Sequence, residues 1–162
     1  MADTKELRLI AFRVGAETFV IDIMIVRQII PARGATAVPN APSFVEGIVV
    51  LRNEVVPIVD LRERFHVEER SEQALIVIID TDTGPIGLKV DEVRRMVTVS
   101  SDALLPPPEI VRGVRGDLLI AVIPSGDEVY LLMDIDSVLT PEERLELQSA
   151  ELSSPAPGTS ER

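Results

Sequence analysis

The feature that most restricts the fold is a series of short segments rich in Val, Ile and Leu, each bounded by turn residues. Runs of roughly 4–8 residues with this composition favour strands over helices. Strands this short bury their apolar side chains only if the sheets close or pack face to face. The sequence therefore predicts a mainly β protein. The expected strands are residues 7–14, 17–21, 47–51, 55–59, 75–79, 86–90, 118–123 and 129–133.

An Asp residue follows an apolar run at four places: Asp22, Asp60, Asp91 and Asp134. An Asp side chain can accept hydrogen bonds from the free N–H groups in the first turn of a helix. Because all four share this position, we interpret them as helix caps rather than as catalytic acids. The expected short helices are residues 23–30, ended by Pro31, and residues 61–65, 92–97 and 135–139.

The two halves of the chain repeat the same order of elements. Residues 54–61 align without a gap on residues 128–135, and residues 26–30 align on residues 93–97. We therefore predict an internal duplication that forms two small barrels around a shared core. The expected halves are about residues 7–73 and 74–139.

Outside the duplicated region the sequence predicts little packed structure. Residues 1–6 are expected to form a polar N-terminal tail. Thr140 and Glu143 have the spacing of a capping box, so residues 140–149 are expected to form a C-terminal helix. Residues 150–162 have no apolar period and are expected to be a disordered tail.

The charge and the lack of cysteine exclude several classes of function. A net charge of −11 at pH 7 repels nucleic-acid phosphates, so no nucleic-acid partner is expected. No apolar stretch reaches the roughly 18 residues of a membrane span, so no membrane insertion is expected. Without Cys there can be no disulfide and no thiolate metal site, in agreement with a reducing cytoplasm. We expect neither a metal nor any other cofactor.

One motif suggests an enzyme: the Asp-Thr-Asp-Thr segment at 80–83, directly after an apolar run. In haloacid-dehalogenase-type phosphatases, one such carboxylate attacks phosphorus and the second moves a proton, with magnesium between them. The other interpretation is a polar hairpin turn, because Asp, Thr, Gly and Pro turn chains. The next apolar run starts at Ile86, which leaves room for a hairpin and not for a crossover. We favour the turn, and the alternative is a magnesium-dependent phosphohydrolase that uses Asp80 and Asp82.

The other charged residues form no catalytic pattern. His66 is the only histidine, so no triad and no multi-histidine metal site is expected around it. The remaining Arg pairs are expected on solvated helix faces. They are Arg62 with Arg64 and Arg94 with Arg95.

Arg52 differs from these because it interrupts an apolar block, residues 48–59. Its guanidinium must reach the surface or find a carboxylate. Two interpretations remain: an exposed hairpin-turn Arg, or a fixed hydrogen-bond donor at the edge of an apolar recognition groove.

Four stretches, in this order, resemble the CheW family of chemotaxis adaptors. The resemblance covers about residues 7–139 and implies two five-stranded β-barrel subdomains with short helices, a shared hydrophobic core, and no catalysis. The matching stretches are residues 18–23 with Val26 and Ile29, residues 38–42 leading to Val45 and Gly47, residues 51–62 with Phe65, and residues 87–93.

The resemblance also implies two protein partners. CheW proteins bind the cytoplasmic hairpin tip of chemoreceptors (methyl-accepting chemotaxis proteins) in a groove between the barrels. They also bind the regulatory domain of the histidine kinase CheA, so that receptor, adaptor and kinase form arrays at the inner membrane. Receptor contact is expected at Val26, Ile29, Val45, Glu46 and Arg52. Kinase contact is expected at Gln28, Ala35 and Thr36.

The central turn departs from the family's Asn-Leu-Arg-Gly pattern. This chain has Val50-Leu51-Arg52-Asn53 instead. Asn53 can adopt the left-handed backbone angles that Gly would supply, so the turn is expected to form. Val50 replaces a polar residue and alters the expected groove. The chain could therefore be a CheW-like protein of a non-chemotaxis pathway that binds only one partner.

Overall fold

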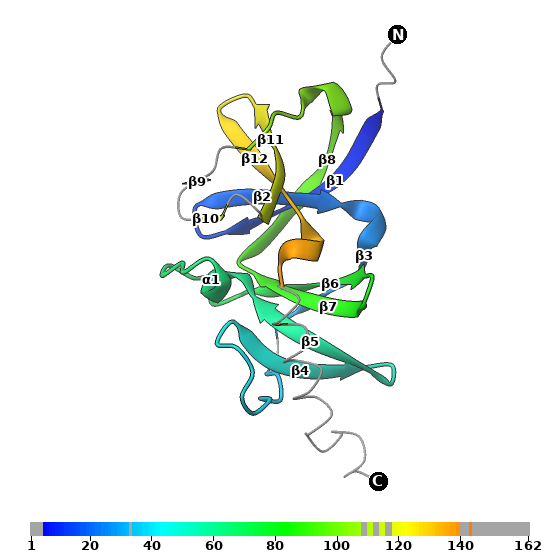
Figure 1. Cartoon of the computed structure of the whole chain (residues 1–162), viewed down its shortest axis with the longest axis vertical. Coiled ribbons are helices and arrows are strands. Elements are labelled where there is room, and N and C mark those ends of the chain that lie inside the picture. Colours follow the sequence, from blue (N-terminus) through cyan, green and yellow to red (C-terminus); the bar gives the residue numbers. More distant parts are fainter. Residues whose placement is uncertain are drawn as a thin grey trace.

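The protein is built from two five-stranded sheets, one above the other in Figure 1. The computed structural model describes residues 5–32, 34–107, 110–111, 114–115, 118–139 and 143. The first sheet has the spatial order β11 (Leu119–Ser125), β12 (Glu128–Met133), β2 (Glu17–Asp22), β1 (Glu6–Val14) and β8 (Glu92–Ser100). The second has the order β3 (Val26–Pro31), β6 (Leu75–Thr81), β7 (Gly84–Val90), β5 (Glu54–Asp60) and β4 (Val45–Leu51).

The helical elements are short. They are α1 (Leu61–Arg64) and the 3₁₀ helices Ile23–Ile25, Ser101–Ala103 and Ile135–Ser137. A two-stranded ribbon joins β9 (Ile110–Val111) to β10 (Val114–Arg115). The prediction of a mainly β fold is confirmed. The expected C-terminal helix and disordered tail lie outside the described residues, apart from Glu143.

The sheets do not coincide with the two halves of the sequence. The first sheet takes β1 and β2 from the N-terminal half and β8, β11 and β12 from the C-terminal half. The second sheet takes β6 and β7 from the C-terminal half and β3, β4 and β5 from the N-terminal half. Each half thus supplies three strands to one sheet and two to the other. The halves are therefore intertwined, and the exact boundary between them stays a prediction.

The two sheets have the same strand pattern, residue for residue. β2 runs parallel to β12 in the first sheet, as β7 does to β5 in the second. The register of β11 with β12 shifts at Ile120, and that of β4 with β5 shifts at Glu46. The residues that the sequence alignment pairs therefore occupy equivalent places in the two sheets. Ile58 faces Gly87, for example, where Leu132 faces Val20.

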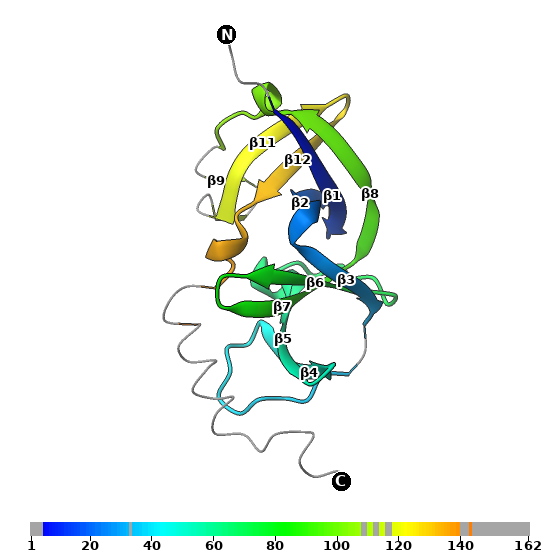
Figure 2. The ribbon, with the colours of Figure 1, turned by 90° about the vertical axis from the view of Figure 1, so that its right-hand side faces the viewer.

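Neither sheet closes into a complete barrel. Figure 2 shows strongly curved strands, but the edge strands of each sheet do not pair directly with one another. The edges meet instead through single bridges: Thr36, after β3, pairs with Ile48 of β4, and Leu105, after β8, pairs with Val122 of β11. The word barrel therefore describes these curved sheets only loosely.

Strands buried on both faces explain the continuous apolar runs of the sequence. In β6, Ile76 and Ile78 face the inside of the second sheet, whereas Val77 and Ile79 face the first sheet. In β1, Leu9 and Ala11 face the inside of the first sheet, whereas Ile10, Phe12 and Val14 point into the core between the sheets. Side chains alternate between the faces of a strand, so one strand serves two apolar clusters.

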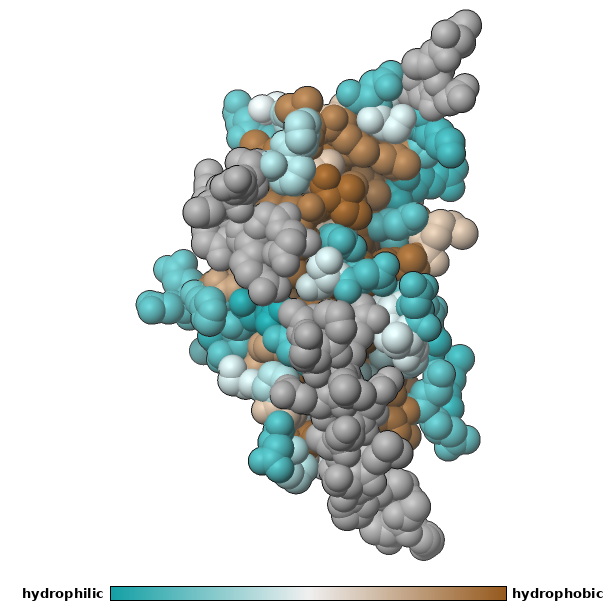
Figure 3. Space-filling model, viewed as in Figure 1, coloured by the Kyte–Doolittle hydropathy of each residue, from teal (hydrophilic) through white to brown (hydrophobic). Residues whose placement is uncertain are grey.

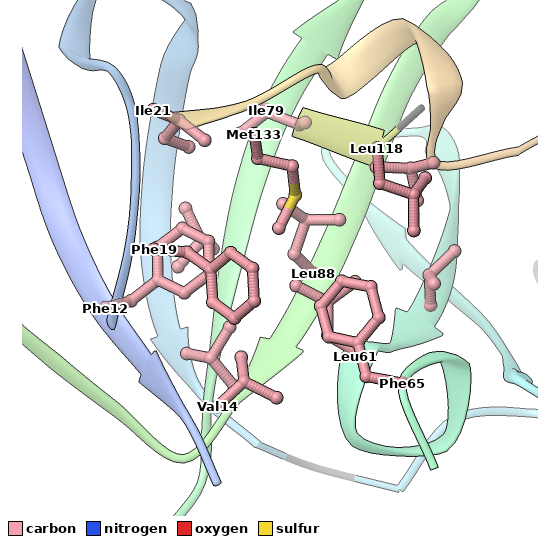
Figure 4. Close-up of a cluster of buried hydrophobic side chains, with 14 of the residues drawn as sticks. Phe12, Val14, Phe19, Ile21, Leu61, Phe65, Ile79, Leu88, Leu118 and Met133 are labelled. Carbon is pink, nitrogen blue, oxygen red and sulfur yellow. The ribbon is translucent and has the colours of Figure 1, made fainter. Parts of the chain in front are cut away.

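The core between the sheets is aromatic at its centre. The rings of Phe12 and Phe19 stack at 6.1 Å between centroids, and those of Phe19 and Phe65 stack at 5.1 Å. Phe12 and Phe19 come from the first sheet, and Phe65 follows α1 beneath it, as Figure 4 shows. Three of the four Phe residues of the chain therefore join the two sheets.

Two of the four predicted helices are wrong. Asp60 and Asp134 accept hydrogen bonds from Arg62 N and Asp136 N and cap short helical turns, as expected. Asp22 caps only the turn Ile23–Ile25, after which the chain continues as strand β3. The expected helix at 92–97 is strand β8. Arg94 and Arg95 therefore lie on a strand and not on a helix face.

The close approach of the Gly47 backbone to the carbonyl group of Thr36 leads to a testable prediction. Gly47 has φ = +154°, and a Cβ there would lie 2.3 Å from the carbonyl oxygen of Thr36. That oxygen accepts the N–H of Ile48 at 2.9 Å. Gly47→Ala must break this bridge or shift the chain, so we expect it to lower the free energy of unfolding by about 3 kcal/mol, at the top of the range for strained backbone.

Gly84→Ala is the matched control. Gly84 also has a positive φ, +122°, but a Cβ there would meet nothing within 4 Å. Denaturant unfolding should show about 1 kcal/mol of loss for this variant, from backbone strain alone. Equal losses in the two variants would show that the contact with Thr36 is unimportant.

Candidate partner-binding surface

Arg52 lies at the tip of the hairpin between β4 and β5. Leu51 pairs with Glu54, so the loop has two residues, Arg52 and Asn53. Both have positive φ, 49° and 67°, as a twist-matched hairpin turn requires. Asn adopts such angles readily, whereas an Arg there is uncommon. The expectation that Asn53 replaces the usual Gly at this turn is confirmed.

The hairpin tip carries both charge and exposed apolar surface. Val50 and Val55 pair across the two strands and are 40% and 39% exposed. Arg52 is exposed and forms no hydrogen bond or ion pair with the other residues that the structure describes. The tip thus presents an uncompensated cation beside an apolar pair, a combination suited to a partner with an apolar face and a carboxylate.

The hairpin is anchored by a neighbouring arginine. The guanidinium of Arg27, in β3, donates to the carboxylates of both Glu54 and Asp80. These bonds, first that to Asp80 and then that to Glu54, raise the pKa of Arg27 above its usual value. Arg27 thereby links three separate elements: β3, the start of β5 and the end of β6.

The five residues expected to contact a receptor are spread along the second sheet. Val26 and Ile29 lie on β3, where Ile29 is 38% exposed and Val26 is half-buried. Val45 is 7% exposed and packs in the core between the sheets. Glu46 pairs with Lys89 at 2.8 Å.

The structure does not bring all five together at one point. Val45 and Arg52 lie at opposite ends of β4, about 20 Å apart at roughly 3.3 Å per residue. Val26 is close to the Arg52 end, because its neighbour Arg27 contacts Glu54 of the hairpin. A groove that includes both Val45 and Arg52 must therefore run the length of β4. The contact roles of these residues stay predictions.

The three residues expected to face a kinase lie along one edge. Gln28 is exposed on β3. Ala35 packs against the inner cluster of the second sheet, and Thr36 carries the backbone bridge to Ile48. These residues follow one another along the β3 edge, on the same strand as Ile29.

A polar groove lies between the sheets, and none of the predicted contact residues is among the residues that line it. Its volume is about 710 Å³. It is lined by Arg13, Glu92 and Val93 of the first sheet side, by Pro31, Ala32, Ala74 and Leu75 of the second, and by Ser71, Glu72, Gln73 and Asp91 between them. Apolar surface gathers elsewhere, over the first sheet in the view of Figure 3.

Sequence reasoning missed a buried ion-pair network that lies where the two sheets meet. Arg62 is 4% exposed rather than solvated. Its Nε and Nη2 donate to Asp60 at 2.9 and 3.2 Å, and its Nη1 donates to Asp91 at 3.1 Å. Asp91 also accepts the N–H groups of Ser71 and Gly15, both at 2.7 Å. Asp91 is therefore no helix cap.

This network connects both sheets. Gly15 is in the β1–β2 turn of the first sheet, Asp60 ends β5 of the second, and Asp91 joins β7 to β8. The sequence signal that could have indicated this network is the position of Arg62 in a short segment that begins with Leu61 and ends with Phe65, both apolar. A charged residue that is buried in such a segment must pair with carboxylates.

Arg64 is also buried, in contrast to the prediction. Its side chain is 9% exposed and pairs with Glu143 at 3.1 Å. Its guanidinium lies 4.3 Å from the centre of the Phe44 ring, within the range of a cation–π contact.

The Asp80–Asp82 segment forms the turn of an antiparallel hairpin. Thr81 pairs with Gly84, which closes β6 and β7 directly and leaves no crossover. The carboxylate of Asp80 is bound by the guanidinium of Arg27. Among the described residues there is no cluster of three or more potential metal ligands. The hairpin agrees with the turn interpretation and does not favour the phosphohydrolase.

Comparison with known proteins decides the family. The family model described as the CheW-like domain matches residues 8–143. The chain belongs to the CheW family. The chemotaxis protein CheW of Rhizobium meliloti is 36% identical over 138 residues, which cover 84% of this chain and 89% of that protein. The CheW of Treponema pallidum is 29% identical over 145 residues, which cover 86% and 85% of the two chains.

A solved structure agrees with this assignment. The scaffolding protein CheW of Thermoanaerobacter tengcongensis superposes with a TM-score of 0.79, over 86% of this chain and 91% of the other. The two sequences are 22% identical, so this similarity is evidence for the fold alone. The family membership agrees with the prediction of a protein that is not an enzyme. In the described part of the chain, no helix is long and apolar enough to span a membrane.

The buried network yields a pH prediction. Burial alone would raise the pKa of Asp91, but the N–H groups of Ser71 and Gly15, and then Arg62, outweigh it and lower the pKa. A lowered folded-state pKa adds stability above the unfolded value of about 3.9 and loses it as pH falls through the folded value. We expect Asp91→Asn to lower the free energy of unfolding by about 3 kcal/mol near pH 7.

The difference from the wild type should begin to shrink as the pH falls below about 4, where Asp91 is protonated in the unfolded chain, and should be lost as the pH falls through the lower folded-state pKa. Urea unfolding at a series of pH values measures this. Asp22→Asn is the control, because Asp22 is an exposed cap and Asn caps equally well, so a change under about 0.5 kcal/mol is expected. A constant difference for Asp91→Asn down to the lowest pH would contradict the assignment.

Proposed function

We propose that this protein is a non-enzymatic adaptor that couples chemoreceptors to a CheA-type histidine kinase in bacterial two-component signalling. It would act in the cytoplasm and be recruited to receptor arrays at the inner membrane, without cofactor. The observation that carries the proposal is the exposed Arg52, which has no ion-pair partner among the described residues, at the tip of the β4–β5 hairpin of a CheW-family chain.

The hairpin tip suits a helical partner. Val50 and Val55 offer an apolar pair on which the apolar face of a receptor helix can pack. Arg52 beside them can donate two parallel hydrogen bonds to a carboxylate or to the last carbonyls of a helix. Val26 and Ile29 on β3 would extend the contact, and Val45 and Glu46 would take part at the far end of β4.

The kinase would use the other edge residues. Gln28 is an exposed side chain on the edge strand β3, and Thr36 is exposed on the segment that follows. With Ala35 they form a border of the second sheet along β3 and the segment that follows it, Gln28 being next to Arg27 and the other two residues further along the chain. Receptor and kinase could then bind together, as a coupling role requires.

Charge reversal tests the receptor contact. We expect Arg52→Glu to weaken binding of the cytoplasmic hairpin-tip fragment of a cognate chemoreceptor by about 2 kcal/mol, or roughly 30-fold. The reason is that the partner carboxylate loses its donor and meets a like charge. Calorimetry measures the affinity, and a melting curve checks that the fold persists.

Arg8→Glu provides the matched control. Arg8 is exposed on β1 of the first sheet, and the substitution changes the net charge by the same amount. Its affinity should stay within about twofold of the wild type, since rim charges far from the contact mainly alter the association rate. Unchanged binding of Arg52→Glu would remove Arg52 from the site.

A second substitution separates the two partners. We expect Thr36→Lys to weaken binding of the kinase regulatory domain about tenfold, because a long charged side chain disturbs a packed contact. Binding of the receptor fragment should be unchanged. A wild-type protein that binds the receptor fragment but no kinase domain would support the one-partner alternative, and Val50→Asn would then test whether the family's polar residue restores coupling.

A further inference from the structure

Arg27 occupies a special place in the second sheet. The register of β3 against β6 shifts between Val26 and Gln28, so Arg27 sits in a β-bulge. From there its guanidinium reaches the carboxylates of Asp80 on β6 and Glu54 on β5. Bulges re-aim a side chain, and here the bulge sends it across the end of two intervening strands.

The ion pairs lie over the open end of the second sheet. Glu54 pairs with Leu51, whose side chain packs on the inner cluster of that sheet. By the alternation of side chains, Asp80 lies on the same face of β6 as Ile76 and Ile78, which belong to that cluster. Arg27 therefore connects the two hairpins across the inner face of the sheet.

The first sheet has an equivalent pair, but a weaker one. Arg94 is the bulged residue of β8, and its Nη1 lies 3.5 Å from Glu128, the residue equivalent to Glu54. The residue equivalent to Asp80 is Arg13, so Arg94 has no second carboxylate of that kind. The hairpin that it contacts has Gly126 and Asp127 at its tip and no Arg. The doubly anchored hairpin is thus the one that carries Arg52.

The anchor also controls charge near the tip. Glu54 is two residues from Arg52 and is a carboxylate to which Arg52 could turn. Because the guanidinium of Arg27 donates to both Glu54 and Asp80, it holds the Glu54 carboxylate in place on the inner face, although its single charge offsets only one of the two carboxylates. Arg52 is then left without a partner among the described residues.

We propose that Arg27 is a positioning residue of the receptor-binding surface: it fixes the β4–β5 hairpin and keeps Glu54 from neutralising Arg52. This inference rests on the proposed function of Arg52. Two effects follow. A hairpin held in its bound geometry loses less conformational entropy on binding. An Arg52 guanidinium without an internal partner need not break an ion pair before it meets the partner's carboxylate.

The test uses the full chain and the receptor hairpin-tip fragment, with calorimetry for affinity. Arg27→Gln should weaken binding about tenfold. Arg27→Lys should also weaken it, because a lysine lacks the fork that holds two carboxylates at once. Adding Glu54→Gln to Arg27→Gln should recover part of the affinity, since the competing carboxylate is gone. Arg94→Gln, the same change at the equivalent bulge, should bind within about twofold of wild type.

Two further readouts separate positioning from loss of fold. The melting temperatures of Arg27→Lys and Arg94→Lys should both stay near that of the wild type, because exposed ion pairs contribute little to stability. Amide resonances of Arg52 and Asn53 should shift in Arg27→Gln and stay in place in Arg94→Gln. Positioning is supported when affinity falls and these resonances move while the melting temperature holds.

The outcomes distinguish this inference from the proposed function. If the wild type does not bind the fragment, or if Arg52→Glu binds as well as the wild type, the proposed function of Arg52 fails. If Arg52→Glu loses affinity but Arg27→Gln and Arg27→Lys do not, only the role of Arg27 is overturned. Equal losses in Arg27→Gln and Arg94→Gln would also overturn it, because the effect would then be general to both sheets.

Discussion

The structure depends on strands that are apolar on both faces. Each central strand sends alternate side chains into its own curved sheet and into the core between the sheets, as Val77 and Ile78 do on β6. Neither sheet alone can shield both of its apolar faces from water, and neither half of the chain forms a complete sheet. Folding therefore requires long-range pairing of β1 with β8 and of β3 with β6. The two sheets should unfold together, as one cooperative unit.

The Arg62 network is the polar counterpart of this core. Removing three charges from water is costly, and good geometry must offset the cost. Here Asp91 accepts from Gly15, Ser71 and Arg62, so its buried oxygens are satisfied. Apolar packing alone does not fix the orientation of one sheet on the other, because it is not directional. These hydrogen bonds are directional and fix the position of the first sheet on the second. The repeat breaks at this point, because the place of Arg62 in the other half is taken by the exposed 3₁₀ turn residue Asp136, and the equivalent turn has no arginine to form such a network.

The strands, their hairpins and the cap at Asp60 could be predicted because they depend on local composition and on period-two alternation. The two wrong helices were predicted because Asp22 and Asp91 were interpreted as helix caps, and one physical feature makes the strands that follow hard to recognise. A bulge at Arg27 and at Arg94 inserts a residue and breaks the alternation. Apolar residues then fall at i, i+3 and i+4, as in Val26, Ile29 and Ile30, which is the spacing of a helix face. For the candidate site, the turn at Arg52 and Asn53 followed from local backbone preference, whereas the burial of Val45 and Arg62 depends on contacts distant in sequence.

The duplicated framework explains how one sheet can carry a recognition surface without loss of stability. Register, bulges and edge bridges are the same in both sheets, so these features are set by the fold. The positions that differ between equivalents are free of that constraint, and Arg52 against Gly126 is one of them. Gly is the residue best suited to a left-handed turn, so an Arg in its place gives up backbone stability. That cost is offset only if the guanidinium contributes elsewhere. Because Arg52 forms no hydrogen bond or ion pair with the other described residues, its guanidinium is available to a partner, as the proposed function requires.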